Sequence, residues 1–196
     1  MFRLIGDRMV GIEQVKFVEL DRLLKHVETP IMTADSMILL LLYAKKDEPI
    51  AGRTLLFKEL FLFYKEILEK IKAKDKVANP EFIGYKYGPF SFLLADILAN
   101  LWIAGMVDVS GRAKGPSERF KLTKVGVKRA EEVLSKMPRI TRRKLLSELS
   151  EKRIGWDQLS RDGIIRYVYN NYPEYTKMSR IKNRYKVLKW GQLFKE

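Results

Sequence analysis

The chain has 196 residues and a formal net charge of +14, which comes from 38 Lys and Arg side chains against 24 Asp and Glu. It has no Cys and one His, His26, so disulfide scaffolds and thiolate chemistry are excluded and a Ser-His-Asp triad is disfavoured. The longest apolar run covers residues 37–44, far short of the ~20 residues that span a bilayer. We therefore expect a cytoplasmic protein with no signal peptide and no membrane span, and its composition is typical of heat-adapted organisms.

Charge is unevenly distributed along the chain. Residues 1–109 carry 15 Lys and Arg and 15 Asp and Glu, whereas residues 110–196 carry 23 and 9, so the whole excess lies in the second part. Such a one-sided field attracts a polyanion, with nucleic acid as the first candidate and an acidic protein or an anionic membrane as the second. A surface that merely keeps the protein soluble is the simpler alternative.

The first two predicted helices flank Pro30. Apolar residues recur at helical spacing over residues 11–28, and Pro30 ends this helix. Asp35 and Ser36 offer an N-cap for a second helix over residues 37–45. Because this second helix is almost entirely Leu and Ile, we expect it at the centre of the core.

A polar linker over residues 47–52 leads to a third helix. Thr54 is its expected N-cap, and the helix extends from Leu55 to about Ala73. Apolar residues on several of its sides predict that other elements enclose it. A polar loop over residues 72–81 follows.

A fourth predicted helix ends at Gly105 and begins at a Gly-Pro turn. Gly88 permits an unusual backbone conformation, and Pro89 suits the first turn of a helix. The helix over residues 90–104 contains no Lys or Arg, so it would read bases weakly even if it entered a major groove. The residues expected on its outer face are Ser91, Ala95, Asp96 and Asn100.

The hydrophobic period then changes to two. Residues 107–110 and 119–123 alternate apolar and polar side chains around a turn-rich loop over residues 111–118, which predicts a β-hairpin with a long basic tip. A helix over residues 123–136 follows. The order of helices and hairpin is that of a winged helix-turn-helix, in which the hairpin is the wing; a generic α+β domain is the alternative.

Residues 138–196 are predicted to be helical and basic. The expected helices cover residues 140–153, residues 160–172 with Ser160 as N-cap, and residues 177–193. The predicted fold is therefore mainly α with a small β-hairpin. An N-terminal helix (1–30) precedes a winged-helix domain (31–137), and a basic helical region (138–196) follows it.

Three short stretches resemble a known family. They are residues 52–58, with the sequence GRTLLFK, residues 85–91, with the sequence YKYGPFS, and the step Phe120-x-Leu122-Thr123 with Gly126. Together, over about residues 35–134, they resemble the YwgA-type proteins of archaea and bacteria and, more distantly, the Panacea antitoxin domain. The chain departs from the family pattern at Phe57, where Gln is usual, and at Phe90, where Tyr is common. The resemblance implies a winged-helix fold and no settled activity.

We find no pattern that predicts catalysis. Asp96 and Asp108 are the acids nearest the apolar centre and nothing pairs them, whereas acid–base hydrolysis needs two carboxylates in opposed environments. The loop from Gly111 to Gly115 lacks the spacing of a phosphate-binding loop, and the basic half lacks carboxylate clusters for metal ions. We therefore expect no enzyme, no cofactor and no metal site.

Binding to double-stranded DNA, as in a transcriptional regulator, is the function that these features favour. We expect contacts mainly to phosphates, so neutralising about six phosphates would give a salt slope near −5 on a logarithmic plot. The candidate residues lie on the wing, the following helix and the C-terminal helices: Arg112, Lys114, Arg119, Lys121, Lys124, Lys128, Arg129, Arg142, Arg143, Lys144, Arg180, Lys182 and Arg184.

The alternative is a protein-interaction module, antitoxin-like or an adaptor, whose basic half docks an acidic partner. Its interaction turn would consist of Tyr85, Tyr87, Gly88, Pro89, Phe90 and Ser91. Tyr85 and Tyr87 could instead stack on bases, although aromatic residues beside a Gly-Pro turn more often belong to the core. A homodimer would use residues 11–28 or 177–193, and membrane binding has only Trp190 and Phe194 in its favour.

Overall fold

The computed structural model describes residues 2–5, 8–11, 32–70, 77–115 and 117–185, and the chain divides into two compact units, Met1–Pro30 and Ile31–Glu196. In the first unit, β1 (Phe2–Ile5) pairs with the antiparallel strand β2 (Arg8–Gly11). The helix predicted over residues 11–28 lies outside the described residues, except for Gly11, which ends β2.

The second unit is mainly helical with small antiparallel sheets, and α2 (Ala34–Tyr43) lies at its centre. Every side chain from Met37 to Leu42 is at most 1% exposed, which confirms the predicted central position. The predicted N-cap is wrong, because the helix begins at Ala34 after the N-cap Thr33. Ser36 is buried in the first turn, where its hydroxyl lies 2.6 Å from that of Thr33.

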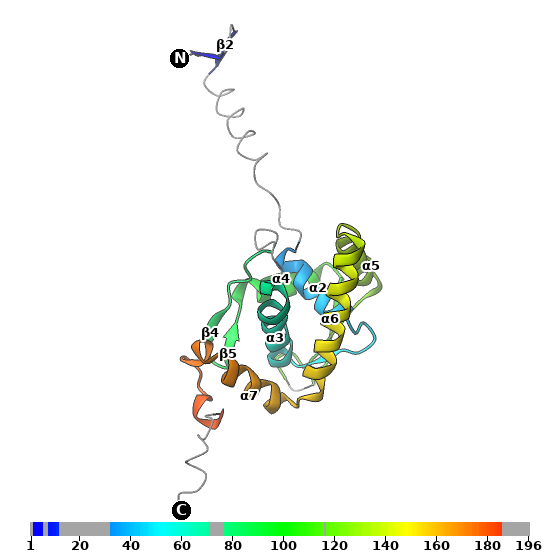
Figure 1. Cartoon of the computed structure of the whole chain (residues 1–196), viewed down its shortest axis with the longest axis vertical. Helices are drawn as coiled ribbons and strands as arrows, with labels where there is room; N and C mark the ends of the chain where they lie inside the picture. Colours follow the sequence, from blue (N-terminus) through cyan, green and yellow to red (C-terminus); the bar gives the residue numbers. More distant parts are fainter. Residues whose placement is uncertain (1, 6–7, 12–31, 71–76, 116, 186–196) are drawn as a thin grey trace, which may run out of the picture. The chain divides into compact units, whose positions relative to one another are not determined.

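Helix α3 (Arg53–Leu62) continues into a π-helical segment, η1 (Phe63–Ile67), and a 3-10 turn, η2 (Leu68–Lys70). Its N-cap is Gly52 and not the predicted Thr54. The residues from Leu56 to Phe63 are all buried, in agreement with a helix enclosed on several sides. Figure 1 shows α3 in the middle of the second unit, with α6 along one side, α7 below and the β4–β5 hairpin on the other side.

A three-stranded antiparallel sheet joins the linker to the predicted hairpin. Strands β6 (Val107–Ser110) and β7 (Arg119–Leu122) pair with Val107 opposite Leu122, which confirms the hairpin. The predicted linker contains a short strand, β3 (Ile50–Ala51), which pairs with β7 and gives the order β3-β7-β6.

The step from this sheet into α5 (Lys124–Ser135) explains one of the motifs. Thr123 is the N-cap; its hydroxyl accepts a hydrogen bond from the Gly126 amide and donates one to the carbonyl of Gly105. A Cβ atom at Gly126 would lie only 2.0 Å from the carbonyl oxygen of Met106, so a side chain cannot be accommodated there. Thr123 and Gly126 therefore have structural roles.

The predicted Gly-Pro turn is a second hairpin. Strands β4 (Ile83–Tyr85) and β5 (Gly88–Phe90) pair, so Pro89 lies in a strand and not in the first turn of a helix. Helix α4 (Phe92–Ile103) begins after Ser91, whose hydroxyl accepts from the Leu94 amide. Ser91 is fully buried and bonded to the Pro80 carbonyl, so its predicted outward position is wrong.

The last described segments pack around α3. They are α6 (Arg139–Gln158), α7 (Arg161–Asn171), and the 3-10 turns η4 (Pro173–Thr176) and η5 (Lys182–Tyr185). Helix α6 begins one residue before and ends five residues after the predicted bounds. Ser160 caps α7 as predicted, through a bond from the Gly163 amide. The helix predicted over residues 177–193 is not an α-helix up to Tyr185, and the rest of it lies outside the described residues.

A buried arginine links α6 to the centre of this unit. Arg153 donates hydrogen bonds to the carbonyls of Leu41, Leu42 and Glu48, at 3.0, 3.4 and 3.1 Å. Its Nε lies 3.4 Å from Oε2 of the fully buried Glu59 on α3. The side chain of Arg153 thus fastens α6 to the C-terminal end of α2 and to α3.

Candidate anion-binding site

Three cavities meet at Thr54, in the first turn of α3. The largest, of about 470 Å³, lies toward α7 and η5. A second, of about 210 Å³, lies under the β4–β5 hairpin, and a third, of about 300 Å³, lies beside the tip of the β6–β7 loop. Because Thr54 lines all three, we treat them as one site and call it the Thr54 hollow.

The side chains around the Thr54 hollow are strongly cationic. Six Lys and Arg side chains line it: Arg53, Lys58, Lys86, Lys114, Arg161 and Arg184. Among the residues that the structure describes, one acid lines it, Asp162, and this carboxylate already accepts a hydrogen bond from Tyr185 and lies 3.4 Å from Arg184. The hydrogen bond from Tyr185 holds the pKa of Asp162 below its ordinary value. Among the described residues that line the hollow, cations therefore outnumber carboxylates, and such an excess favours an anion.

The backbone of α3 adds to this charge. Gly52, with φ of +87°, is the N-cap and has no side chain to bond the first amides of the helix. Its own N–H donates to the carbonyl of Glu118 at 2.7 Å. The first amides of an α-helix have no intrahelical acceptor and form the positive end of its dipole, so this end of α3 favours an anion.

Arg53 is held in place by a buried carboxylate. Its Nη2 donates to Oε1 of Glu118 at 2.8 Å and its Nε donates to Oε2 at 3.3 Å. Burial alone would raise the pKa of Glu118, but hydrogen bonds from Arg53 and the backbone of Lys114 outweigh it, and the pKa falls below its ordinary value. This pair ties the start of α3 to the base of β7, so Arg53 shapes the hollow more than it contributes free charge.

Lys58 lies at the inner wall of the cavity under the β4–β5 hairpin. Its side chain is 2% exposed, and its Nζ donates to the carbonyl of Pro89 at 3.0 Å. Among the residues that the structure describes, no carboxylate pairs with it. Burial lowers the pKa of this amine to about 7.

The β4–β5 hairpin approaches α7 closely at Gly88, whose φ is +87°. A Cβ atom at this position would lie 2.8 Å from the Tyr169 ring.

Aromatic rings form the apolar wall of the same cavity. Tyr85, Tyr87 and Phe90 line it, and Tyr87 is half exposed. The Phe90 ring stacks on Phe57 of α3, with centroids 4.5 Å apart, and the Tyr85 ring lies 5.6 Å from Phe90. Packing on α3 thus fixes the Phe90 ring, and the Tyr85 ring packs on Phe90 in turn.

Part of the predicted site lies at this hollow. Of the predicted interaction turn, Tyr85, Tyr87, Gly88, Pro89 and Phe90 line it and the buried Ser91 does not. Of the thirteen predicted DNA-contacting cations, Lys114 and Arg184 line it.

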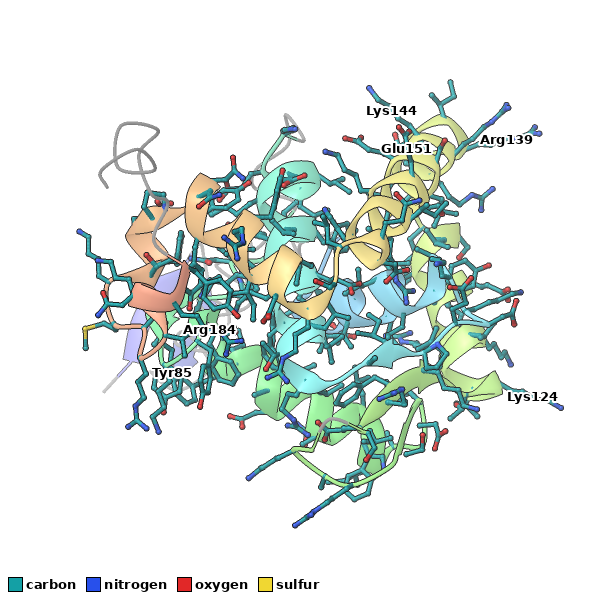
Figure 2. The ribbon with its side chains drawn as sticks, turned by 90° about the horizontal axis from the view of Figure 1, so that it is seen from below. Tyr85, Lys124, Arg139, Lys144, Glu151 and Arg184 are labelled. Atoms are coloured by element: carbon teal, nitrogen blue, oxygen red, sulfur yellow. The ribbon has the colours of Figure 1, made fainter. Side chains whose placement is uncertain are left out.

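The other predicted cations are distributed over several elements. Figure 2 shows Arg184 and Tyr85 at one end of the molecule and Lys124 at the other, with Arg139 and Lys144 on the first turns of α6. Two of these cations have local carboxylate partners, since Lys121 lies 3.7 Å from Asp108 and Arg129 lies 3.1 Å from Glu132. The rest lie in the β6–β7 hairpin, on α5, on α6 and in the segment after α7: Arg112, Arg119, Lys124, Lys128, Arg142, Arg143, Lys144, Arg180 and Lys182. Among them, Lys124 lies on the opposite side from Arg184 in Figure 2, whereas the backbone N–H of Arg180 donates to the carbonyl of Lys86, so Arg180 lies beside the hollow.

The sequence-based selection missed four cations of the site, Arg53, Lys58, Lys86 and Arg161. Three of them belong to the half of the chain with zero net charge, so a charge count gave no sign of them. Lys58 did carry a signal, because together with Glu59 it interrupts the apolar residues of 55–64.

Helix α4 presents a surface of the opposite character. Its outer side exposes Phe92 (52%), Leu93 (36%), Trp102 (56%) and Ile103 (76%), together with Asp96. The sequence of α4 contains no Lys or Arg, so this surface is apolar with a single acid.

No helix within the described residues is long and apolar enough to cross a membrane, and no three acidic or His side chains of that part gather around a point where a metal ion could bind. No protein-family model and no curated protein matches the chain. The resemblance to YwgA-type proteins and to the Panacea antitoxin domain therefore stays a prediction.

Proposed function

We propose that this chain is a DNA-binding protein of the winged helix-turn-helix class, in the role of a transcriptional regulator, and that it holds phosphates of duplex DNA at the Thr54 hollow. The order α2, β3, α3, α4, β6, β7, with β3 and β6 on either side of β7, supports that class. In such proteins the hairpin after the third helix is the wing, and here its tip contributes Lys114 to the hollow.

The observation that carries the proposal is the cationic lining of the hollow. Lys86, Lys114, Arg161 and Arg184 come from four separate segments and reach one concave surface that offers a single carboxylate. Phosphate contacts supply most of the affinity of proteins that bind DNA without strong sequence preference. We therefore expect affinity that falls steeply with salt.

The apolar surface of α4 limits how well the protein can recognise a base sequence. Base edges in a major groove are recognised by donors and acceptors such as Arg, Lys, Asn and Gln, and the exposed side of α4 offers Asn100 alone among these. The proposal is therefore one of backbone binding with modest sequence preference.

A salt titration with two matched double variants tests this function. Binding of a mixed-sequence duplex is followed by fluorescence anisotropy between 50 and 300 mM KCl. Lys114→Glu with Arg161→Glu changes the hollow, and Lys136→Glu with Arg139→Glu makes the same charge change at the exposed α5–α6 junction. We expect the hollow pair to weaken binding at least tenfold and to reduce the salt slope by about 2, and the control pair to weaken it less than threefold.

Two outcomes would overturn the proposal. Equal loss in both double variants would show that net charge alone attracts the duplex. No binding of the unmodified protein at 50 mM KCl would exclude a DNA-binding function.

The second candidate is a protein-interaction module, antitoxin-like or an adaptor. The exposed Phe92, Trp102 and Ile103 of α4 favour it, because aromatic and aliphatic side chains gathered on one helix are typical of interaction surfaces. This candidate would replace the first if the duplex fails to bind at low salt.

A further inference from the structure

We propose that the Thr54 hollow holds one purine nucleotide with a preference for guanine, its base in the cavity under the β4–β5 hairpin and its phosphate in the cavity beside the β6–β7 loop. This inference rests on the proposed function, since it concerns the same hollow, and it names the ligand class. The nucleotide is either a free one or an unpaired one of a nucleic-acid strand.

The cavity under the β4–β5 hairpin has the chemistry that a base requires. Its walls are the rings of Tyr85, Tyr87 and Phe90, and stacking on aromatic side chains is the usual way in which proteins hold an unpaired base. Packing on Phe57 fixes Phe90, so part of this wall is already formed without a ligand.

The neighbouring cavity has the chemistry that a phosphate requires. It is lined by the first turn of α3, by Lys114 and Gly115 of the β6–β7 loop, and by Arg161 at the start of α7. The two cavities share Arg53, Thr54 and Lys114, so a ligand extends from one into the other without crossing the core. The cavity suited to a base therefore lies next to the cavity suited to a phosphate, as the binding of one nucleotide requires.

Lys58 supplies the preference for guanine. Its Nζ has three N–H donors and uses one on the Pro89 carbonyl, and no carboxylate in the described part of the chain takes the others. Guanine presents two adjacent acceptors, O6 and N7, whereas adenine presents a donor amine at the position of O6. When Lys58 carries its charge, its Nζ can only donate, so at the wall of this cavity it favours the first pattern and opposes the second.

The test measures binding of guanosine and adenosine monophosphate to the full chain by isothermal titration calorimetry. We expect guanosine monophosphate to bind at least threefold more tightly than adenosine monophosphate. Lys58→Met should abolish this difference, and Tyr87→Ala should weaken binding about tenfold while Tyr87→Phe retains it. Lys136→Met, which removes an exposed lysine of the α5 C-terminus, is the matched control and should change nothing.

A second arm identifies the source of the nucleotide. A single-stranded decathymidine with one central guanine is compared with the all-thymidine strand. Binding of free guanosine monophosphate assigns the hollow to a free nucleotide; binding of the guanine-containing strand alone assigns it to an unpaired base of a strand. If neither binds, or if adenine and guanine bind equally, the inference fails. If the inference fails but Lys114→Glu with Arg161→Glu still weakens duplex binding more than the control pair does, the proposed function stands, so the two failures are distinguishable.

Discussion

Two regions of the molecule bury a cation, and they differ in the hydrogen-bond acceptors and carboxyl groups that surround it. At the α2–α3–α6 seam, Arg153 is 1% exposed, donates to three backbone carbonyls and lies beside the carboxylate of Glu59. In the cavity under the β4–β5 hairpin, Lys58 is equally buried and donates to one carbonyl, that of Pro89. The cation at the seam has three carbonyl acceptors and a neighbouring carboxyl group, and the one at the cavity has a single carbonyl acceptor.

The difference separates a structural cation from one that is available to a ligand. A buried charge costs several kcal/mol unless hydrogen bonds and an opposite charge offset the loss of water. Arg153 meets the first condition through three carbonyl acceptors and lies beside Glu59, although burial raises the pKa of this carboxyl to about 8. Lys58 has one carbonyl acceptor, and burial lowers its pKa to about 7 because its environment does not stabilise the charged form. Groups of this second kind concentrate at functional sites.

The largest effect is expected at the seam. Arg153→Met leaves the carbonyls of Leu41, Leu42 and Glu48 without their donor and leaves Glu59 buried without its opposite charge. We expect a loss of about 3–5 kcal/mol in the free energy of unfolding, measured by urea denaturation at pH 7. Adding Glu59→Leu should recover part of this loss, because the double variant leaves no buried carboxyl group without a partner. A loss below about 1 kcal/mol would mean that water reaches the seam, and the contrast with Lys58 would disappear.

A smaller loss is expected when the buried anion beside the hollow is changed. Glu118→Gln removes the charge that holds Arg53 and ties α3 to β7, and hydrogen bonds to charged groups contribute about 1.5–3 kcal/mol. Because folding lowers the pKa of Glu118, its stabilisation is complete above the ordinary glutamate pKa of 4.5 and is lost as the pH falls below it. Urea denaturation at pH 7 and pH 3.5 should therefore show the two proteins converging at the lower pH. A constant difference at both pH values would contradict this.

Elements that depend on local signals could be predicted from the sequence. Helix α2 followed from its apolar run, the β6–β7 hairpin followed from alternation around a turn-rich loop, and Ser160 caps α7 as expected. In each, residues close in the chain decide the structure.

Elements that depend on distant partners could not be predicted. Strand β3 has two residues and exists because β7 pairs with it, and Pro89 lies in a strand because β4 pairs with it. The Arg53–Glu118 pair joins residues 65 positions apart, so no spacing rule would reveal it.

Only part of the candidate site could be predicted from the sequence, for a related reason. A charge count treats every cation alike, but folding uses several C-terminal cations inside the protein: Lys152 pairs with Glu66 at 2.9 Å, and Arg153 pairs with Glu59. This frees cations of the neutral half, such as Lys58 and Lys86, to line the hollow. Net charge by segment therefore suggested the proposed binding of an anion without locating the candidate site.

Lys58→Met should raise the free energy of unfolding, whereas Arg153→Met at the seam should lower it. Methionine keeps the length of the side chain and removes an uncompensated amine, so we expect a gain of about 1–2 kcal/mol at pH 6, with the lost bond to Pro89 as the opposing effect. In the unmodified protein, folding releases a proton between pH 7 and the ordinary lysine pKa of 10.5, so its stability rises with pH in this window.

Urea denaturation at pH 6, 8 and 10 should accordingly show the advantage of the methionine variant shrinking as the pH rises. Lower stability of the variant at every pH would mean that the hydrogen bond to Pro89 outweighs the burial of the charge, and that Lys58 is a structural residue like Arg153.

The smallest effect on stability is expected on α4, where the apolar surface contrasts with the cationic hollow. Ile103 is 76% exposed, so Ile103→Ser should change the free energy of unfolding by less than about 0.5 kcal/mol. Leu98→Ser on the same helix is the matched control: Leu98 is 2% exposed, and placing a hydroxyl in the core should cost at least about 3 kcal/mol. Duplex affinity should stay within twofold for Ile103→Ser if α4 makes no contact with DNA. A tenfold loss of duplex affinity at unchanged stability would place DNA on the apolar surface of α4 and remove the contrast between the two surfaces.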